Sequence, residues 1–169
     1  MNRQAGLTVI EILVVLAIVG VLITLGLPAL SDLVEDQQLT SDSNDLFSSL
    51  FAARSEAVTR NEVVSICKIV AAAPTACAAG ARWQDGWITF VDNDIDGVAD
   101  AGEEILGTYT GMGTTTSVTS AAFPDFISYS PSGSSNNNGT FNICVSGNSA
   151  RDIFINATGR PRIADGSCP

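Results

Sequence analysis

Carboxylates recur at regular spacing between residues 92 and 103, and they are the side chains of this sequence whose order most clearly suggests chemistry. The acids are Asp92, Asp94, Asp96, Asp100 and Glu103, at positions 1, 3, 5, 9 and 12 of a twelve-residue run with Gly97 at position 6. A calcium-binding loop presents its oxygen ligands at this spacing, and clustered carboxylates repel one another unless a cation lies among them. The run therefore indicates a calcium site. Its alternative is an acidic turn between two strands, with glycine supplying positive φ.

A second group of side chains has the opposite charge. Arg160 and Arg162 lie in the run Gly159-Arg160-Pro161-Arg162, and with Arg151 they form a basic cluster in a chain of net charge -10. An acidic surface repels polyanions, so nucleic-acid binding would need such a local patch. Guanidinium groups contact phosphates through paired donors, and Pro161 would stiffen their spacing. A last strand with solvated arginines is the alternative.

Four cysteines stand at positions 67, 77, 144 and 168, and the chain has no histidine. Four cysteines allow three sets of two disulfides. We predict Cys67 with Cys77, which closes a short alanine-rich loop, and Cys144 with Cys168, which ties the tail to a core strand. Zinc is disfavoured because no C-x2-C pair exists. Without histidine, a G-x-S-x-G elbow or a phosphate-binding glycine loop, the sequence predicts that the chain is not an enzyme.

The N-terminal segment determines where these groups are placed. Residues 12–31 are uncharged and mostly apolar, and twenty helical residues span about 30 Å, the thickness of a bilayer core. Arg3 precedes them, so the N-terminus is expected in the cytoplasm. A plain signal anchor and a secretory signal cleaved near Pro28-Ala29-Leu30-Ser31 are alternatives. Neither explains Glu11 at the edge of the run, because a carboxylate costs about 2.5–3.5 kcal/mol at a bilayer centre.

A helix is expected to continue from residue 31 to residue 60, where no proline or glycine occurs. Its apolar positions share one face, which we expect to pack against a sheet. They are Leu39, Leu46, Leu50, Ala53 and Ala57. The acids of this segment are expected on other faces. They are Asp32, Glu35, Asp36, Asp42 and Asp45.

After residue 60 the apolar pattern alternates, which predicts short strands at residues 63–69, 86–91, 104–109, 126–129, 140–145 and 152–156. Residues 130–139 are rich in Ser and Asn and predict an exposed loop. One long helix followed by strands indicates an α+β fold, with the helix laid across an antiparallel sheet.

The start of the chain resembles the class III signal of type IV pilins and type II secretion pseudopilins. The residues that carry the resemblance are Gly6-Leu7-Thr8-Val9-Ile10-Glu11 and the apolar run after them. It implies that a prepilin peptidase cuts between Gly6 and Leu7 and N-methylates Leu7, where Phe is more usual. It also implies that Glu11 pairs with the N-terminal amine of a neighbouring subunit. That role suits a buried carboxylate, which needs a partner. Pro28 matches the helix-kinking proline of pilins.

Three further segments resemble the FimT/GspH branch, the minor pilins and minor pseudopilins: residues 53–61, 83–92 and 156–162. The resemblance implies a pilin-like fold with a leader at 1–6, a transmembrane or filament-core half-helix at 7–31 and a periplasmic domain at 32–169. It also implies a subunit near the filament tip that helps to initiate assembly. In the FimT part of the branch a GRxR tail binds DNA during natural transformation. Contacts to a neighbouring subunit are the other role open to these arginines.

The expected partners are other major and minor pilins or pseudopilins, the prepilin peptidase, the inner membrane and double-stranded DNA. No cofactor is expected beyond calcium. The expected location is the inner membrane, single-pass with the N-terminus cytoplasmic, and then a pilus or pseudopilus. The GRxR run favours a minor type IV pilin, and the alternative is a minor pseudopilin of a type II secretion system.

Overall fold

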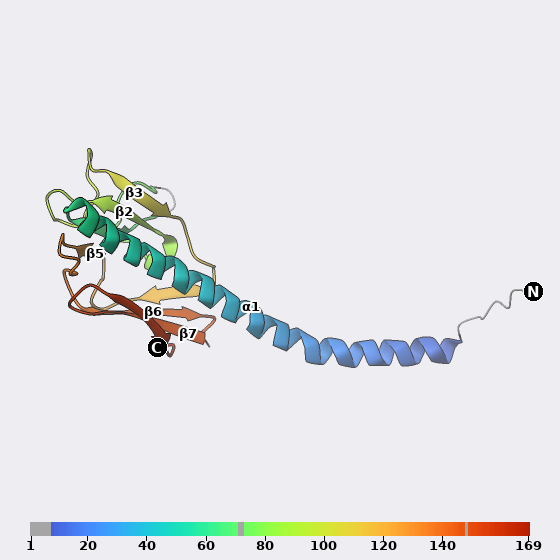
Figure 1. The fold of residues 1–169 in the computed structure, drawn as a ribbon. Coiled ribbons are helices and arrows are strands. Elements are labelled where there is room, and N and C mark those ends of the chain that lie inside the picture. The colour runs from blue at the N-terminus through green and yellow to red at the C-terminus, as the bar shows by residue number, and fades with distance from the viewer. Residues whose placement is uncertain (1–7, 71–72, 148) are drawn as a thin grey trace, which may run out of the picture. The chain divides into compact units, whose positions relative to one another are not determined.

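A computed structural model describes residues 8–70, 73–147 and 149–169, without the side chains of residues 23–30 and 32. One helix, α1, runs from Val9 to Arg60, and antiparallel strands follow it (Figure 1). This confirms the α+β fold with a long N-terminal helix. The chain divides into two compact units, one ending at Glu35 and the other covering Asp36–Pro169.

The described residues of the second unit form eight strands in two four-stranded sheets, where the sequence suggested one sheet. The first sheet has the order β3-β2-β1-β5, and the second has the order β4-β6-β7-β8. Every pair in both sheets is antiparallel. The strands are β1 (Val64–Lys68), β2 (Trp87–Val91), β3 (Ile105–Tyr109), β4 (Thr116–Thr119), β5 (Phe126–Tyr129), β6 (Gly139–Val145), β7 (Ser149–Ile155) and β8 (Pro161–Asp165).

The predicted apolar face of the helix is the core of the second unit. Leu46, Leu50, Ala53 and Ala57 are fully buried and Leu39 nearly so, and they pack in one cluster with side chains of both sheets. In the same cluster Trp83, from the short 3-10 helix η1 (Trp83–Asp85), donates its indole N–H to the Phe123 carbonyl at 2.9 Å. The apolar face therefore explains why α1 docks where it does.

One helix acid contradicts the expectation that the acids avoid the buried face. Asp42 is 1% exposed, and its carboxylate accepts hydrogen bonds from Gln38, at 2.8 Å, and from the Thr116 hydroxyl of β4. Asp45 is half-buried and accepts a hydrogen bond from the Tyr109 hydroxyl of β3 at 3.0 Å. Burial of a carboxylate is tolerated when donors satisfy it, so these two acids orient α1 on both sheets.

Both predicted disulfides are present, Cys67–Cys77 and Cys144–Cys168, with Cα atoms 5.6 and 5.5 Å apart. Lys68 ends β1 with its side chain almost fully buried, and its ammonium pairs with the Asp125 carboxylate at 3.0 Å. These contacts attach residues outside the strands to β1 and β6.

Two strands were not predicted as such. β4 has the sequence Thr-Ser-Val-Thr, whose single apolar side chain gives almost no alternation. β8 contains Pro161 and Arg162, and proline is confined to edge strands. Its position at the edge of the second sheet accommodates that proline, and residues 161–165 form the last strand that the alternative for the basic run expected.

Candidate functional site: a basic hairpin and an acidic loop

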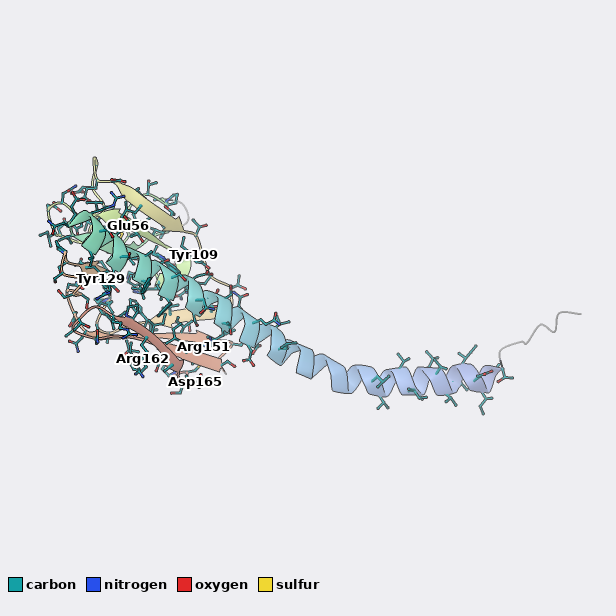
Figure 2. All side chains as sticks on the ribbon, in the orientation of Figure 1. Glu56, Tyr109, Tyr129, Arg151, Arg162 and Asp165 are labelled. Carbon is teal, nitrogen blue, oxygen red and sulfur yellow. A yellow bond between two sulfur atoms is a disulfide. The ribbon has the colours of Figure 1, made fainter. Side chains whose placement is uncertain are left out.

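Arg160 and Arg162 lie at one end of the hairpin formed by β7, β8 and the turn of residues 156–160, which we name the basic hairpin. Phe154 of β7 and Arg162 of β8 are direct cross-strand partners. The guanidinium carbon of Arg162 lies 5.1 Å from the centre of the Phe154 ring, a cation–π distance. Figure 2 shows Arg162 on this hairpin. Among the described residues neither Arg160 nor Arg162 forms an ion pair, and both are exposed.

The turn of the basic hairpin is held by its own first residue. The Asn156 side-chain oxygen accepts hydrogen bonds from the Arg160 N–H at 2.9 Å and from the Thr158 hydroxyl at 2.8 Å. The Asn156 carbonyl accepts a third from the Gly159 N–H at 2.8 Å. Asn side chains commonly satisfy backbone groups of a turn in this way. The backbone at Arg160 is thus fixed without using its guanidinium.

Gly159, the first residue of the GRxR run, has a structural function. Its φ is 73°, and a Cβ there would collide with the Gly133 carbonyl and press on the Ser135 N–H. Gly133 lies in the loop of residues 130–138, which we name the bracing loop. Only glycine allows this close approach of two backbones at positive φ. The hairpin turn therefore packs directly on the bracing loop.

Arg54 of α1 joins these two loops to the helix. Its Nε donates to the Gly133 carbonyl at 2.9 Å, and its terminal nitrogen donates to the Thr158 carbonyl at 3.3 Å. Guanidinium groups bridge two acceptors in a fixed geometry, and charge-assisted bonds are stronger than neutral ones. Arg54 thus attaches the turn of the basic hairpin to α1. No sequence motif predicted this role.

Arg151 does not join the other two arginines, contrary to the predicted cluster. It pairs across β6 and β8 with Ile143 and Asp165, and it lies three residues from Phe154. Side chains alternate between faces along a strand, so Arg151 shares the face of the buried Ile143 and lies opposite to Phe154 and Arg162. Arg151 and Arg162 occupy different positions along the hairpin (Figure 2). The basic surface therefore consists of Arg160 and Arg162.

The predicted calcium run, residues 92–103, forms the connection between β2 and β3, and we name it the acidic loop. Carboxylate oxygens of Asp92, Asp94 and Asp96 lie within 4.8 Å of one another, whereas Asp100 and Glu103 are not part of this group. Glu103 instead accepts hydrogen bonds from the Asn93 N–H at 2.7 Å and the Asp100 N–H at 3.0 Å. Three of the five predicted ligands are therefore brought together.

Asp92 anchors the acidic loop to the first sheet. It is 1% exposed and accepts hydrogen bonds from the Ser65 hydroxyl of β1 at 2.5 Å and from the Gly97 N–H at 3.0 Å. The Cys77 sulfur also contacts the acidic loop, where it accepts a hydrogen bond from the Ala99 N–H at 3.0 Å. No donor to the Asp94 carboxylate is found among the residues that the structure describes. Its pKa lies above the ordinary value, because neighbouring groups displace water and because surrounding carboxylates repel its charge.

Glu11 lies in the first turn of α1, where it forms a weak reciprocal pair with Thr8. The Thr8 N–H donates to the Glu11 carboxylate at 3.4 Å, and the Glu11 N–H donates to the Thr8 hydroxyl at 3.4 Å. This is the capping-box arrangement, which the spacing Thr-x-x-Glu could have indicated from the sequence. The cleavage site at Gly6 and Leu7 lies outside the described residues. The helix continues through Pro28, and the kink stays a prediction.

Within the part of the chain that the structure describes, no helix combines the length and hydropathy that a membrane span requires.

Comparisons with known proteins agree with the resemblance at both ends of the chain. The family described as type II transport protein GspH matches residues 42–159, and the prokaryotic N-terminal methylation motif matches residues 1–27. The pilin-like protein PilA1 of Thermus thermophilus is 36% identical over 115 residues, which are 67% of this chain and 64% of that protein. The type IV major alpha-pilin of Moraxella bovis is 44% identical over 46 residues, 27% of this chain and 29% of that protein. The chain thus spans less than two thirds of the length of these relatives.

Crystal structures of the type IV minor pilin FimU of Pseudomonas aeruginosa have the same fold. They match with a TM-score of 0.59 at 21% identity, covering 79% of this chain and 92% of FimU in one crystal form, and 78% and 100% in the other. The GspH match extends over most of the second unit. It contains the helix face from Leu46 onward, the first sheet, the acidic loop and the strands β4, β6 and β7 of the second sheet, and it ends before β8. Together with the methylation motif, it shows that this chain belongs to the GspH/FimT family of minor type IV pilins and pseudopilins, which are structural subunits and not enzymes.

Proposed function

We propose that this chain is a minor type IV pilin that lies near the tip of the filament, helps to initiate its assembly and binds DNA through Arg160 and Arg162. The observation that carries the DNA role is the pair of exposed guanidinium groups of Arg160 and Arg162, which form no ion pair among the described residues of an otherwise acidic chain. Family membership implies assembly with other pilins and processing by a prepilin peptidase.

The assembly role depends on the N-terminal segment. Cleavage between Gly6 and Leu7 would create an ammonium group, and Glu11 of a neighbouring subunit could neutralise it in the filament core. Among the described residues the Glu11 carboxylate accepts one hydrogen bond, the weak contact from the Thr8 N–H at 3.4 Å, and this bond can be exchanged for the ammonium group. Residues 7–31 would hold the chain in the inner membrane before assembly, with residues 32–169 in the periplasm. A Glu11→Gln chain should be cleaved normally but be recovered less in sheared filaments.

DNA binding by two guanidinium groups should be weak and sensitive to salt. With about two phosphates neutralised, the slope of log K against log salt is about -1.8 for a duplex, so affinity falls about twelvefold between 50 and 200 mM salt. The full chain in detergent micelles, titrated with a labelled 20-base-pair duplex and followed by fluorescence anisotropy, measures this slope.

The matched variants for this titration are Arg160→Gln with Arg162→Gln, and Arg82→Gln as the control. The Arg82 side chain is 70% exposed and pairs with Asp85 of η1, which is not part of the hairpin. We expect the double variant to lose duplex binding and the control to retain it. Equal binding by wild type and double variant would exclude the hairpin as the DNA site.

A minor pseudopilin of a type II secretion system is the second candidate, supported by the description of the GspH family as a type II transport protein. Deletion of the gene distinguishes the two. Loss of pili, twitching and DNA uptake supports the first function, whereas loss of exoprotein release with intact pili supports the second. The neighbouring genes, for pilus and competence or for secretion, give the same distinction.

For the acidic loop we propose calcium binding, supported by the three carboxylates of Asp92, Asp94 and Asp96 within 4.8 Å. Oxygen ligands of this kind suit Ca²⁺. A cation would offset both the lost hydration and the carboxylate repulsion that raise the pKa of Asp94. Isothermal calorimetry of the full chain should show heat at millimolar calcium, and Asp94→Asn with Asp96→Asn should abolish it. Glu104→Gln, an exposed acid just outside the loop, is the charge control. Absence of heat in the wild type would end this proposal.

A further inference from the structure

The outer face of the basic hairpin carries a shallow hollow of about 490 Å³. It is lined by Phe154, Ile155, Asn156, Arg160, Pro161 and Arg162. Its lining combines an aromatic ring, a guanidinium group over that ring and a second guanidinium group beside them. A purely electrostatic contact with a duplex backbone would involve the two arginines but not the Phe154 ring.

The pairing of Phe154 with Arg162 forms a stacking surface. Phe154 is half-buried between Thr140 of β6 and Arg162 of β8, its two cross-strand partners, so its position is fixed by the sheet. Unpaired bases stack on aromatic rings and on guanidinium planes, and both kinds of surface are present here. Bases inside a duplex are stacked on each other and cannot reach such a surface.

Arg160 completes the geometry, because it borders the same hollow. Residues 160 and 162 are two apart on an extended segment, so their Cα atoms lie about 6.6 Å apart along it. A base can therefore stack on the guanidinium of Arg162 while Arg160 contacts the phosphate of an adjacent nucleotide. Asp152 lies on the same face of β7 two residues from Phe154, and its carboxylate accepts a hydrogen bond from Asn142 at 2.8 Å. Because the Asp152 carboxylate repels phosphates, a bound nucleic-acid strand is restricted to the end of the hairpin near Arg160.

We propose that the basic hairpin binds single-stranded nucleic acid, with one unpaired base stacked on the Arg162 guanidinium, which the Phe154 ring supports from below, and a flanking phosphate held by Arg160. This inference rests on the proposed DNA-binding function of the same arginines and specifies the form of DNA that they recognise. Since stacking is tolerant of base identity, the site distinguishes unpaired from paired strands and has little sequence preference.

The test compares three probes of equal charge on the full chain in detergent micelles at 50 mM salt. They are a labelled twelve-nucleotide single strand, the same strand with abasic sites at its six central positions, and a duplex with the same number of phosphates. Anisotropy should show that the intact single strand binds about five to ten times more tightly than the abasic strand.

Phe154→Leu should reduce this ratio to about one while retaining the binding of the abasic strand, and Phe154→Trp should increase it. Phe51→Leu changes an exposed aromatic residue of α1 that lies outside the hollow, and it should leave the ratio unchanged. Thermal unfolding of each variant verifies that the hairpin is still folded.

Equal affinity for the intact and abasic strands in the wild type would overturn the stacking site, and the proposed DNA-binding function would survive it. A duplex that binds more tightly than the single strand would overturn it as well. No binding of any probe would mean that the proposed DNA-binding function has failed, and the stacking site with it.

Discussion

The acidic loop connects two antiparallel strands, and the basic hairpin consists of two antiparallel strands and their turn. The two regions use their charged side chains in opposite ways. In the acidic loop Asp92 and Glu103 accept hydrogen bonds from backbone N–H groups and a hydroxyl, so they hold the loop together. In the basic hairpin Asn156, Gly159 and Arg54 hold the backbone, and the guanidinium groups of Arg160 and Arg162 remain exposed. Charge alone therefore does not identify a binding site. Charged side chains whose hydrogen-bonding groups are not used within the fold are a better indication of a binding site.

The largest effect is expected from the disulfides, one beside each region. Replacing Cys144 and Cys168 by serine should lower the free energy of unfolding by about 3.4 kcal/mol, because it opens a loop with a sequence separation of 24. For Cys67 and Cys77, separated by 10, the loss should be about 2.7 kcal/mol. Urea unfolding of both variants measures the difference. A larger loss of stability for the Cys67/Cys77 variant than for the Cys144/Cys168 variant would contradict this expectation.

Gly159 and Gly147 offer a matched pair with nearly equal φ values of 73° and 74°. A Cβ at Gly147 meets nothing within 4 Å, whereas one at Gly159 collides with the backbone of the bracing loop. The destabilisation of Gly159→Ala should therefore exceed that of Gly147→Ala by about 2 kcal/mol. Equal losses, measured by the same urea titration, would show that the hairpin turn does not need its contact with the bracing loop.

Arg54→Met should lower the free energy of unfolding by about 1 kcal/mol, because the Gly133 and Thr158 carbonyls lose their donors. It should also increase hydrogen exchange at the backbone N–H groups of residues 158–160. Arg60→Met is the control, since Arg60 pairs with the carboxylates of Glu56 and Glu104 at the surface. We expect a smaller loss there and no change of exchange in the hairpin.

The smallest effect is expected at Asp94. Its folded-state pKa is raised, so its contribution to stability is favourable at low pH and is lost as the pH rises through that pKa. In the presence of a chelator, Asp94→Asn should melt slightly above the wild type at neutral pH, and the two should converge in acid. Added calcium should reverse the order at neutral pH. A wild type that melts higher even in chelator would show that Asp94 already has a favourable partner.

Much of the fold followed from the sequence because the signals were local. The spacing of Leu46, Leu50 and Ala53 defines a helix face whatever the rest of the chain does, and the structure buries that face completely. Both disulfides were predicted, because the pairs nearest in sequence were also the pairs that the strands bring together. β4 could not be found in this way, since its Thr-Ser-Val-Thr sequence is held by pairing with β6 and not by its own pattern.

The candidate sites were predictable only in part, because register decides which charges meet. Arg151 is close to Arg160 in sequence, yet it lies on the other face of β7, and a shift of one residue would reverse this. Asp42 was placed among solvated acids, although its position between Leu39 and Leu46 falls within the buried stripe. The roles of Arg54 and Gly159 depend on contacts with residues 130–138 that are remote in sequence, and no local pattern records them.

The pairing of Lys68 with Asp125 has a practical consequence for experiments on this protein. Lys68 is the single lysine of the chain, and its ammonium group is almost fully buried. Amine-directed dyes and crosslinkers will therefore leave the folded second unit almost unmodified. Reagents specific for guanidinium groups, such as dicarbonyls, will instead report on the accessible positive charge of the folded second unit.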